Sequence, residues 1–401
     1  MKLLKDRNIF LYILYTFLFG LYPIIPIMSL FFLAKNLGFS EIGIIFAVFS
    51  ISGFLFEIPT GYIGDRYGRK NSVMIGLAIL GMASFIWTII SGIFMFSIFA
   101  AVWMLGLAFI SGSFDGYMYD YLKSKNQEKS YDKLLSLAGT TSYFAGALGS
   151  IIGAYIFSID INYPYYLLGF LFFICIAIVS FMKKDFQAKD VEFHDELKVF
   201  SGISYIAQNK SVLWITRYTA LLFGFFSYFR GSVDKPFILS LELFDIKWLG
   251  VFVAISMFIQ SFFMSQFSKI KDKIGENGLI ILYFITSSIP LIIMSYSFGL
   301  LALFAITIFY VNESFQGALI NSFCQKHIPS KIRATTLSSI NVYLNIVGAI
   351  IALASGYLFD ILSIRTGLMI AFVYTITVFI LSYAFRPDFT KNSSLPAQAG
   401  L

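Results

Sequence analysis

Apolar residues fill twelve long stretches of the chain, and short polar segments separate most of them. An α-helix needs roughly 20 apolar residues to cross a bilayer, and each stretch reaches that length. The stretches are continuous and lack the period-two alternation of a membrane β-barrel. The pattern therefore predicts an all-α integral membrane protein with twelve transmembrane helices. These helices are expected at residues 8–34, 40–63, 72–91, 94–122, 134–158, 163–182, 211–240, 246–268, 278–297, 299–325, 333–362 and 365–385.

The composition excludes a soluble globular protein. Hydrophobic residues make up 58% of the 401 residues and charged residues only 13%, about half the charged share of a typical soluble domain. Such a chain cannot cover its surface with polar groups. It belongs in a bilayer, where helices satisfy their own backbone hydrogen bonds.

The positive charges predict the orientation. If the N-terminus is cytoplasmic, the internal segments hold 23 of the 29 Lys and Arg residues, and the external loops hold only Lys35, Lys247 and Arg365. Cytoplasmic loops carry this excess in membrane proteins, so both termini are expected inside the cell, with the protein in the inner (cytoplasmic) membrane. The net charge of +7 follows from this bias, and we expect no nucleic-acid partner.

The two cysteines, Cys175 and Cys324, fall in predicted helices far apart in the sequence. No spacing of Cys or His typical of a metal centre occurs. We therefore expect no catalytic residue, no metal, no cofactor and no enzyme activity.

The chain divides into two similar halves. The motif SFDG at 113–116 returns as SFQG at 314–317, and GYIGDRYGRK at 61–70 has a degenerate copy that begins at Ser268. Motifs that recur at nearly the same distance along the sequence predict a duplicated six-helix unit, as in transporters built from parallel repeats. The expected parts are an N-terminal bundle at 1–182, a cytoplasmic linker with a short amphipathic helix at 183–210, a C-terminal bundle at 211–386 and a polar tail at 387–401.

The charged loop after the second predicted helix invites a structural interpretation. Gly61, Gly64 and Gly68 allow a tight turn and the close approach of another helix. Asp65 ends the second helix, where its carboxylate can accept hydrogen bonds from the N-terminus of a neighbouring helix.

Arg69 can reach back toward Asp120 at the cytoplasmic end of the fourth helix. We interpret Asp65, Arg69 and Asp120 as a cytoplasmic latch that holds the two halves together when the protein opens outward and breaks when it opens inward. The alternative is that the basic residues only fix topology and contact lipid phosphates, and we favour this alternative for Arg66 and Lys70.

The loop resembles the G-x-x-x-D-R-x-G-R-K loop between helices 2 and 3 of the major facilitator superfamily. The resemblance implies two six-helix bundles related by pseudo-two-fold symmetry, and a monomeric secondary transporter that works by alternating access. It also implies that Asp65 meets the eleventh helix near residues 330–333. The matching positions are Gly61, Asp65, Arg66, Gly68, Arg69 and Lys70.

Two further stretches, EIPTG and SGSFDGYMYDYL, resemble bacterial efflux members of the drug–proton antiporter kind. The fifth predicted helix departs from that subset, because GSIIGA stands where the antiporters carry GPxxGG. The resemblance therefore leaves the direction of transport open.

Charged residues inside membrane helices are costly and usually functional. The resemblance implies that helices 1, 4, 7 and 10 line the cavity, so Asp115, Arg230 and Glu313 are candidates for binding protons or substrate. Glu57 is a fourth candidate. Alternatively, Glu57 or Asp115 pairs with Arg217 or Arg230 and never titrates. We interpret Asp234 and Lys235 as a solvated rim at the outer edge.

Two function classes follow. The first is proton-coupled export of small amphipathic or cationic compounds, with acids in the cavity recognising the cation. The second is uptake or facilitated transport of a polar metabolite such as a sugar, peptide or organic anion, in which Arg230 binds an anionic group. A lipid flippase on the same fold is a further alternative. The expected partners are a small-molecule substrate, protons and membrane lipids.

Overall fold

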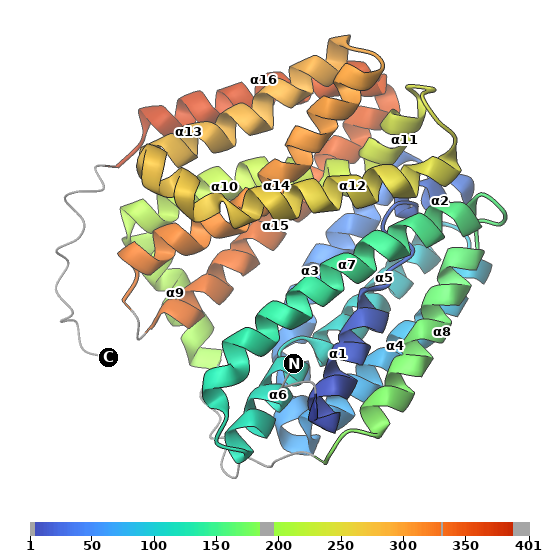
Figure 1. Ribbon diagram of the computed structural model, residues 1–401. Helices are drawn as coiled ribbons and strands as arrows, with labels where there is room; N and C mark the ends of the chain where they lie inside the picture. The colour runs from blue at the N-terminus through green and yellow to red at the C-terminus, as the bar shows by residue number, and fades with distance from the viewer. Residues whose placement is uncertain (1–4, 185–195, 330–331, 388–401) are drawn as a thin grey trace. The chain divides into compact units, whose positions relative to one another are not determined.

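The computed structural model describes residues 5–184, 196–329 and 332–387 of the chain (Figure 1). Residues 185–195 of the predicted linker and 388–401 of the predicted tail lie outside this part, as do residues 330–331, near which Asp65 was expected to meet the eleventh helix. Within it the structure is helical and has no strand. The early helices are α1 (Arg7–Gly20), α2 (Met28–Ala34), α3 (Phe39–Tyr67), α4 (Arg69–Ile89), α5 (Ile93–Ile110), α6 (Ser113–Ser124), α7 (Tyr131–Phe157) and α8 (Tyr163–Ser180).

The later helices begin after the linker. An α-helix is found where the amphipathic pattern predicts one, as α9 (Glu196–Gln208). The others are α10 (Lys210–Tyr228), the π-helical turn η3 (Phe229–Val233), α11 (Asp234–Leu239), α12 (Ile246–Ser265), α13 (Phe267–Tyr296), α14 (Leu300–His327), α15 (Arg333–Ile361) and α16 (Ile364–Ala384).

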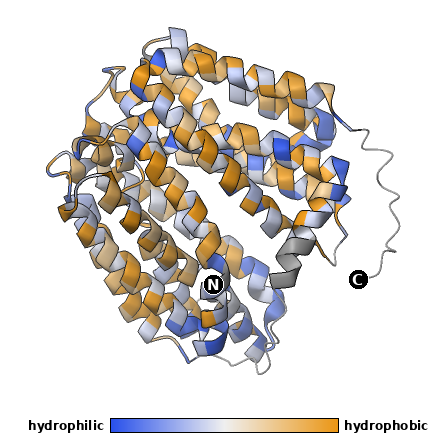
Figure 2. Ribbon diagram, turned by 180° about the vertical axis from the view of Figure 1, so that it is seen from behind, coloured by the Kyte–Doolittle hydropathy of each residue, from blue (hydrophilic) through white to orange (hydrophobic). Residues whose placement is uncertain are grey.

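Eleven segments of the described chain are helical, long and apolar enough to cross a membrane. Figure 2 shows that hydrophobic residues dominate these helices and that hydrophilic ones gather near their ends and in the connections. The predicted all-α membrane fold is confirmed.

The first predicted helix is wrong as a continuous span. Instead of one helix over residues 8–34, the structure has α1 up to Gly20 and α2 from Met28, with turns between them. Pro23 and Pro26 lie in that gap, and proline supplies no backbone N–H for helical bonding. Hydropathy alone does not register this break, because every residue from Leu21 to Ile27 except the prolines is apolar or aromatic.

Contacts divide the chain into two compact units. The first unit comprises Met1–Glu192 and Gly231–Phe258, and the second comprises Phe193–Arg230 and Ile259–Leu401. In the first unit, α4 packs on α5 and α8, and α1 packs on α7 and α8. In the second unit, α10 packs on α15, and α13 packs on α14 and α16.

Aromatic rings fill the core of each unit. In the first, Trp87 of α4 contacts the rings of Phe32, Phe96 and Tyr165 and is almost fully buried. Such edge-on and stacked pairs add about 0.5–1.5 kcal/mol each beyond the burial of their area. Part of the abundance of Phe and Tyr thus serves packing inside the units.

Glycines with positive φ recur at matching places in the repeat. Gly68 (φ 99°) separates α3 from α4, and Gly275 (φ 68°) kinks α13 at the corresponding position of the degenerate copy. Gly92 and Gly299, which precede α5 and α14, also have positive φ. Residues with a Cβ avoid this conformation, so the glycines keep the two turns alike.

Candidate functional site

The charged loop is a sharp turn between two helices. Gly68 ends α3 with a φ of 99°, and α4 starts immediately at Arg69. The turn places Arg69 four residues after Asp65, and the Arg69 Nε lies 3.2 Å from the Asp65 Oδ1. The predicted pairing of these two residues is therefore present in the first unit.

Arg69 also reaches the acid predicted on the fourth span. Its Nη1 lies 2.9 Å from the Oδ2 of Asp120 on α6, so one guanidinium bridges two carboxylates. The three side chains are 27–38% exposed, so solvent weakens the Coulombic attraction within each pair. The bridge joins the turn to α6 within the first unit.

Gly116 makes room for this bridge. A Cβ on Gly116 would overlap the Nη1 of Arg69, because the guanidinium lies against the α6 backbone at this point. In the sequence, SFDG marks the repeat and belongs to a stretch that resembles efflux transporters, but this role of Gly116 was not predicted. The signal was present: a glycine stands one helical turn before the acid that Arg69 was expected to reach.

Lys70 has a more specific contact than the lipid phosphates we favoured for it. Its Nζ donates to the carbonyl oxygens of Ser180 (2.9 Å) and Met182 (2.7 Å) at the end of α8. A lysine stabilises a helix C-terminus because it satisfies carbonyls that lack an intrahelical partner. Arg66 instead donates to the hydroxyl of Tyr62 at 3.0 Å on an exposed face.

The close approach expected at the loop glycines falls at Gly64. A Cβ there would lie 2.9 Å from the Oγ of Ser113 and 3.2 Å from that of Ser72. A Cβ on Gly61 would meet no heavy atom within 4 Å. The matching Gly61 of the motif therefore has no packing role visible within the described residues.

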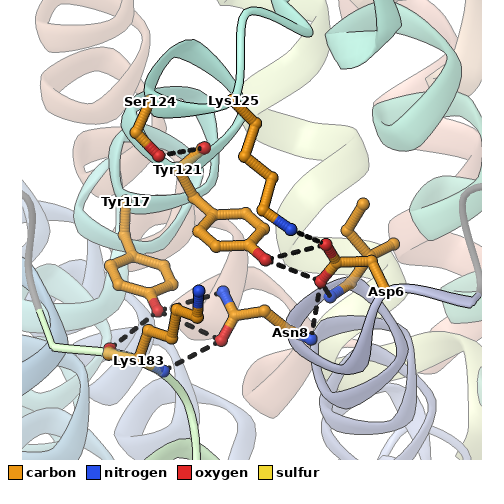
Figure 3. A network of polar contacts seen from close by, with 8 residues as sticks. Asp6, Asn8, Tyr117, Tyr121, Ser124, Lys125 and Lys183 are labelled. Atoms are coloured by element: carbon orange, nitrogen blue, oxygen red, sulfur yellow. Dashed lines mark hydrogen bonds and ion pairs between the residues drawn. The ribbon is translucent and has the colours of Figure 1, made fainter.

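A second polar network ties the start of α1 to the end of α6 (Figure 3). Asp6 caps α1 by accepting from the backbone N–H of Asn8 (2.9 Å), accepts from the hydroxyl of Tyr121 (2.6 Å) and pairs with Lys125. Burial by itself would raise the pKa of Asp6, but the hydrogen bonds from Lys125, Tyr121 and the backbone outweigh it and lower the pKa below its ordinary 3.8. This capping aspartate was not predicted from the sequence.

Asn8 extends the network to the end of α8. Its Nδ2 donates to the Tyr117 hydroxyl at 3.1 Å, and its Oδ1 accepts from the Lys183 backbone N–H at 2.9 Å (Figure 3). The Tyr117 hydroxyl in turn donates to the Lys183 carbonyl at 2.9 Å. The ends of α1, α6 and α8 are thus fixed to one another beside the Arg69 bridge.

Asp115 lies in the first turn of α6. The fourth predicted span is interrupted at Gly112 (φ 69°), and α6 starts at the next residue. The Asp115 carboxylate therefore lies near the N-terminus of a separate helix. The Tyr12 hydroxyl of α1 donates to its Oδ1 at 3.4 Å. Asp115 is exposed, as is Glu57 on α3. Neither carboxylate has a cationic partner within 4 Å among the described residues.

The other two candidates pair with each other. Arg230 forms an ion pair with Glu313 of α14, stands over the ring of Tyr310 at 5.0 Å and lies 3.4 Å from the Oε1 of Gln260. Arg230 sits in the π-helical turn η3, and such turns are frequent at functional sites. All four residues belong to the second unit.

The interpretation of Asp234 and Lys235 as a solvated rim is wrong. Asp234 is fully buried and Lys235 is 5% exposed, and their side chains pair at 2.7 Å. Adjacent residues seldom face each other on a regular helix. Here they start α11 directly after the π-helical turn, and the Asp234 carboxylate also accepts from the Lys235 backbone N–H.

The small residues of α7 fit the break after α1. A Cβ on Gly153 would overlap the carbonyl of Pro23, and one on Gly149 would lie 2.8 Å from the backbone N of Tyr22. The stretch GALGSIIGA thus lets the irregular backbone lie against a helix, which is the ordinary use of small residues between membrane helices.

The fold and the loop together define the class of protein: a multi-pass membrane transporter, not an enzyme. The model of the Major Facilitator Superfamily matches residues 9–352, so the chain belongs to this family.

The chain is similar to several transporters of this family. An uncharacterised MFS-type transporter of Methanocaldococcus jannaschii is 24% identical over 94% of this chain and 98% of its own. Multidrug resistance protein 2 of Bacillus subtilis is also 24% identical, over 76% of this chain and 77% of its own. The crystal structure of the nucleoside transporter NupG superposes with a TM-score of 0.78 at 14% identity, covering 95% of this chain and 98% of that one.

Proposed function

We propose that the protein is a proton-coupled secondary transporter that exports small amphipathic or cationic compounds by alternating access. The carrying observation is the contrast between the two central acids. Glu313 is neutralised by Arg230, whereas Asp115 has no cation within 4 Å in the described chain. An acid left without a cation at membrane depth is suited to bind a proton or a cationic substrate in turn. The similarity to a multidrug resistance protein supports drug-like compounds as the substrate class.

The conformational part of the proposal assigns the latch to Asp65, Arg69 and Asp120, whose bridge lies within the first unit and would act by holding the turn against α6 in one of the two states. The moving halves are the proposed bundles at 1–182 and 211–386, a division that differs from the two contact-based units in the placement of residues 231–258. The proposed site of action is the cytoplasmic membrane with both termini inside. Breaking and remaking a partly exposed bridge costs little free energy, so it suits a switch that must turn over repeatedly.

Arg230 supports a second candidate, the transport of an anionic or polar metabolite. A guanidinium beside a tyrosine ring is a good anion site. In the structure, however, the guanidinium of Arg230 already pairs with Glu313, so an anionic substrate would have to displace that carboxylate. The second candidate therefore requires an extra step that cation export does not.

Transport by the purified protein in liposomes tests the proposal. We expect an imposed pH gradient to drive ethidium or tetraphenylphosphonium, and Asp115→Asn to abolish the gradient-driven movement. Asp245→Asn is the matched control, since Asp245 is an exposed acid paired with Lys247. Movement of uridine or xylose without either cation would favour the second candidate, and movement of a labelled phospholipid alone would favour a flippase.

A further inference from the structure

A cavity of about 250 Å³ lies beside the break in the first span. Helices α1, α7 and α12 and the turn after α1 contribute its walls, and all of these residues belong to the first unit. The lining residues are Phe19, Gly20, Tyr22, Ile25, Ser142, Tyr143, Gly146 and Met257.

The position of the cavity suggests a role for the break between α1 and α2. Irregular backbone at membrane depth is tolerated where it is buried in protein or lines a cavity, and interrupted helices mark binding sites in other transporters. Tyr22 and Ile25 come from the irregular stretch itself and face this space.

One wall is rigid and one is adaptable. The Tyr22 ring is held edge-on by Trp103 and Phe172, with centroids 6.3 Å away in each case. A Cβ on Gly146 would lie 2.9 Å from the Cε of Met257, so the methionine packs against α7 at the edge of the cavity. Methionine is flexible and suits surfaces that accept ligands of different shape.

The lining chemistry identifies the ligand class. Aromatic and aliphatic side chains predominate, Ser142, Tyr22 and Tyr143 each carry a hydroxyl, and none of the lining residues is charged. An apolar cavity of roughly 150 Å³ can hold one benzene ring, so this space is large enough for one or two rings. It is smaller than the pockets of roughly 300–1,000 Å³ that enclose a drug-sized molecule, so it would hold a part of one.

We infer that this cavity is a binding site for an uncharged aromatic ring, which under the proposed function is the ring end of the transported cation. Only the identification of the ring with part of the transported cation rests on the proposed function. Tyr12, which contacts Asp115, and Phe19, which lines the cavity, are seven residues apart on α1. Seven residues are two turns on one helix face, about 10 Å. An aromatic cation of that length reaches from the acid to the cavity.

Photolabelling tests the cavity independently of transport. The protein in lipid nanodiscs is irradiated with 3-trifluoromethyl-3-phenyldiazirine, an uncharged aromatic probe, and the labelled residues are mapped by mass spectrometry. We expect saturable labelling at Tyr143 and Met257. Met257→Phe fills the cavity and should remove this labelling. Met82→Phe, at an exposed position on α4 outside the cavity, should keep it. Labelling that rises without saturation and is unchanged in Met257→Phe overturns the inference.

Transport separates the two proposals. If the ring end binds here, Met257→Phe should slow tetraphenylphosphonium about tenfold, the scale of a steric change in an apolar pocket, and leave tetramethylammonium unchanged. Met257→Ala should instead favour bulkier cations. Cation transport with equal rates in Met257→Phe and wild type removes the cavity from the pathway. Saturable labelling without any cation transport leaves the ring site standing and contradicts the proposed function.

Discussion

The guanidinium of Arg69 lies against the backbone of Gly116, one helical turn before the Asp120 carboxylate that it contacts at 2.9 Å. No residue with a Cβ fits at position 116 while this bridge is in place. The bridge thus depends on a residue that carries no charge and no functional group.

Gly116→Ala should therefore break the bridge from Arg69 to Asp120 without changing any charge. In most helix interiors, exchanging glycine for alanine stabilises by up to about 1 kcal/mol. Here the methyl group would displace the guanidinium, so we expect slower transport and no gain in melting temperature. Gly139→Ala is the control, because a Cβ there meets no heavy atom within 4 Å in α7. Equal melting temperatures and transport rates for the two variants would remove the steric argument.

The acids of the latch should act as one network. Asp65→Asn and Asp120→Asn each leave Arg69 with one carboxylate, and the double variant leaves it with none. Residues that share a partner are not additive, so the double variant should differ from the sum of the single ones by about 0.5 kcal/mol or more. The measurement is the population of inward-open and outward-open states, from distances between spin labels on the cytoplasmic ends of the two halves. Wild-type distance distributions in all three variants would contradict the latch.

The sequence predicted the fold well because the bilayer imposes strong rules. A continuous apolar run of sufficient length has to be helical, and the charged loop marks the turn at Gly68 by its glycines and bases. The prediction failed at the first span, where two prolines interrupt a stretch that is otherwise apolar or aromatic. Local backbone chemistry, not hydrophobicity, decides such breaks.

The site was predicted in part for a similar reason. Arg69 and Asp120 were paired through spacing and membrane depth, which the sequence contains. The pairing of Arg230 with Glu313, the burial of Asp234 and the capping role of Asp6 depend on which helix faces meet. That information is tertiary, and a single sequence with a weak repeat does not provide it.

The pair of Arg230 and Glu313 should matter to folding as well as to transport. Removing one partner leaves a partly buried charge uncompensated, so Glu313→Gln should lower the stability by about 1–3 kcal/mol. The double variant Arg230→Gln/Glu313→Gln should recover most of that loss, since no net charge remains. Thermal denaturation in detergent measures both. If the double variant were no more stable than Glu313→Gln, the pair would not be the reason for the loss.

The network of Asp6 and Lys125 should give the first unit a defined pH window. The pKa of Asp6 is lowered from 3.8, so its contribution is complete above that pH and is lost as the pH falls through the folded-state pKa. The hydrogen bond that Lys125 donates to Asp6 raises the pKa of Lys125 above 10.5. The contribution of Lys125 is therefore complete below 10.5 and is lost as the pH rises through the folded-state pKa.

Asp6→Asn removes the ion pair but keeps an amide that can still cap α1. We expect it to lower the stability by about 1 kcal/mol between these limits, and the difference from wild type to shrink below pH 3.8. Melting temperatures across the pH range measure this, with Asp245→Asn as the exposed control. A difference that persisted undiminished well below pH 3.8 would show that Asp6 stabilises α1 by other means than its charge.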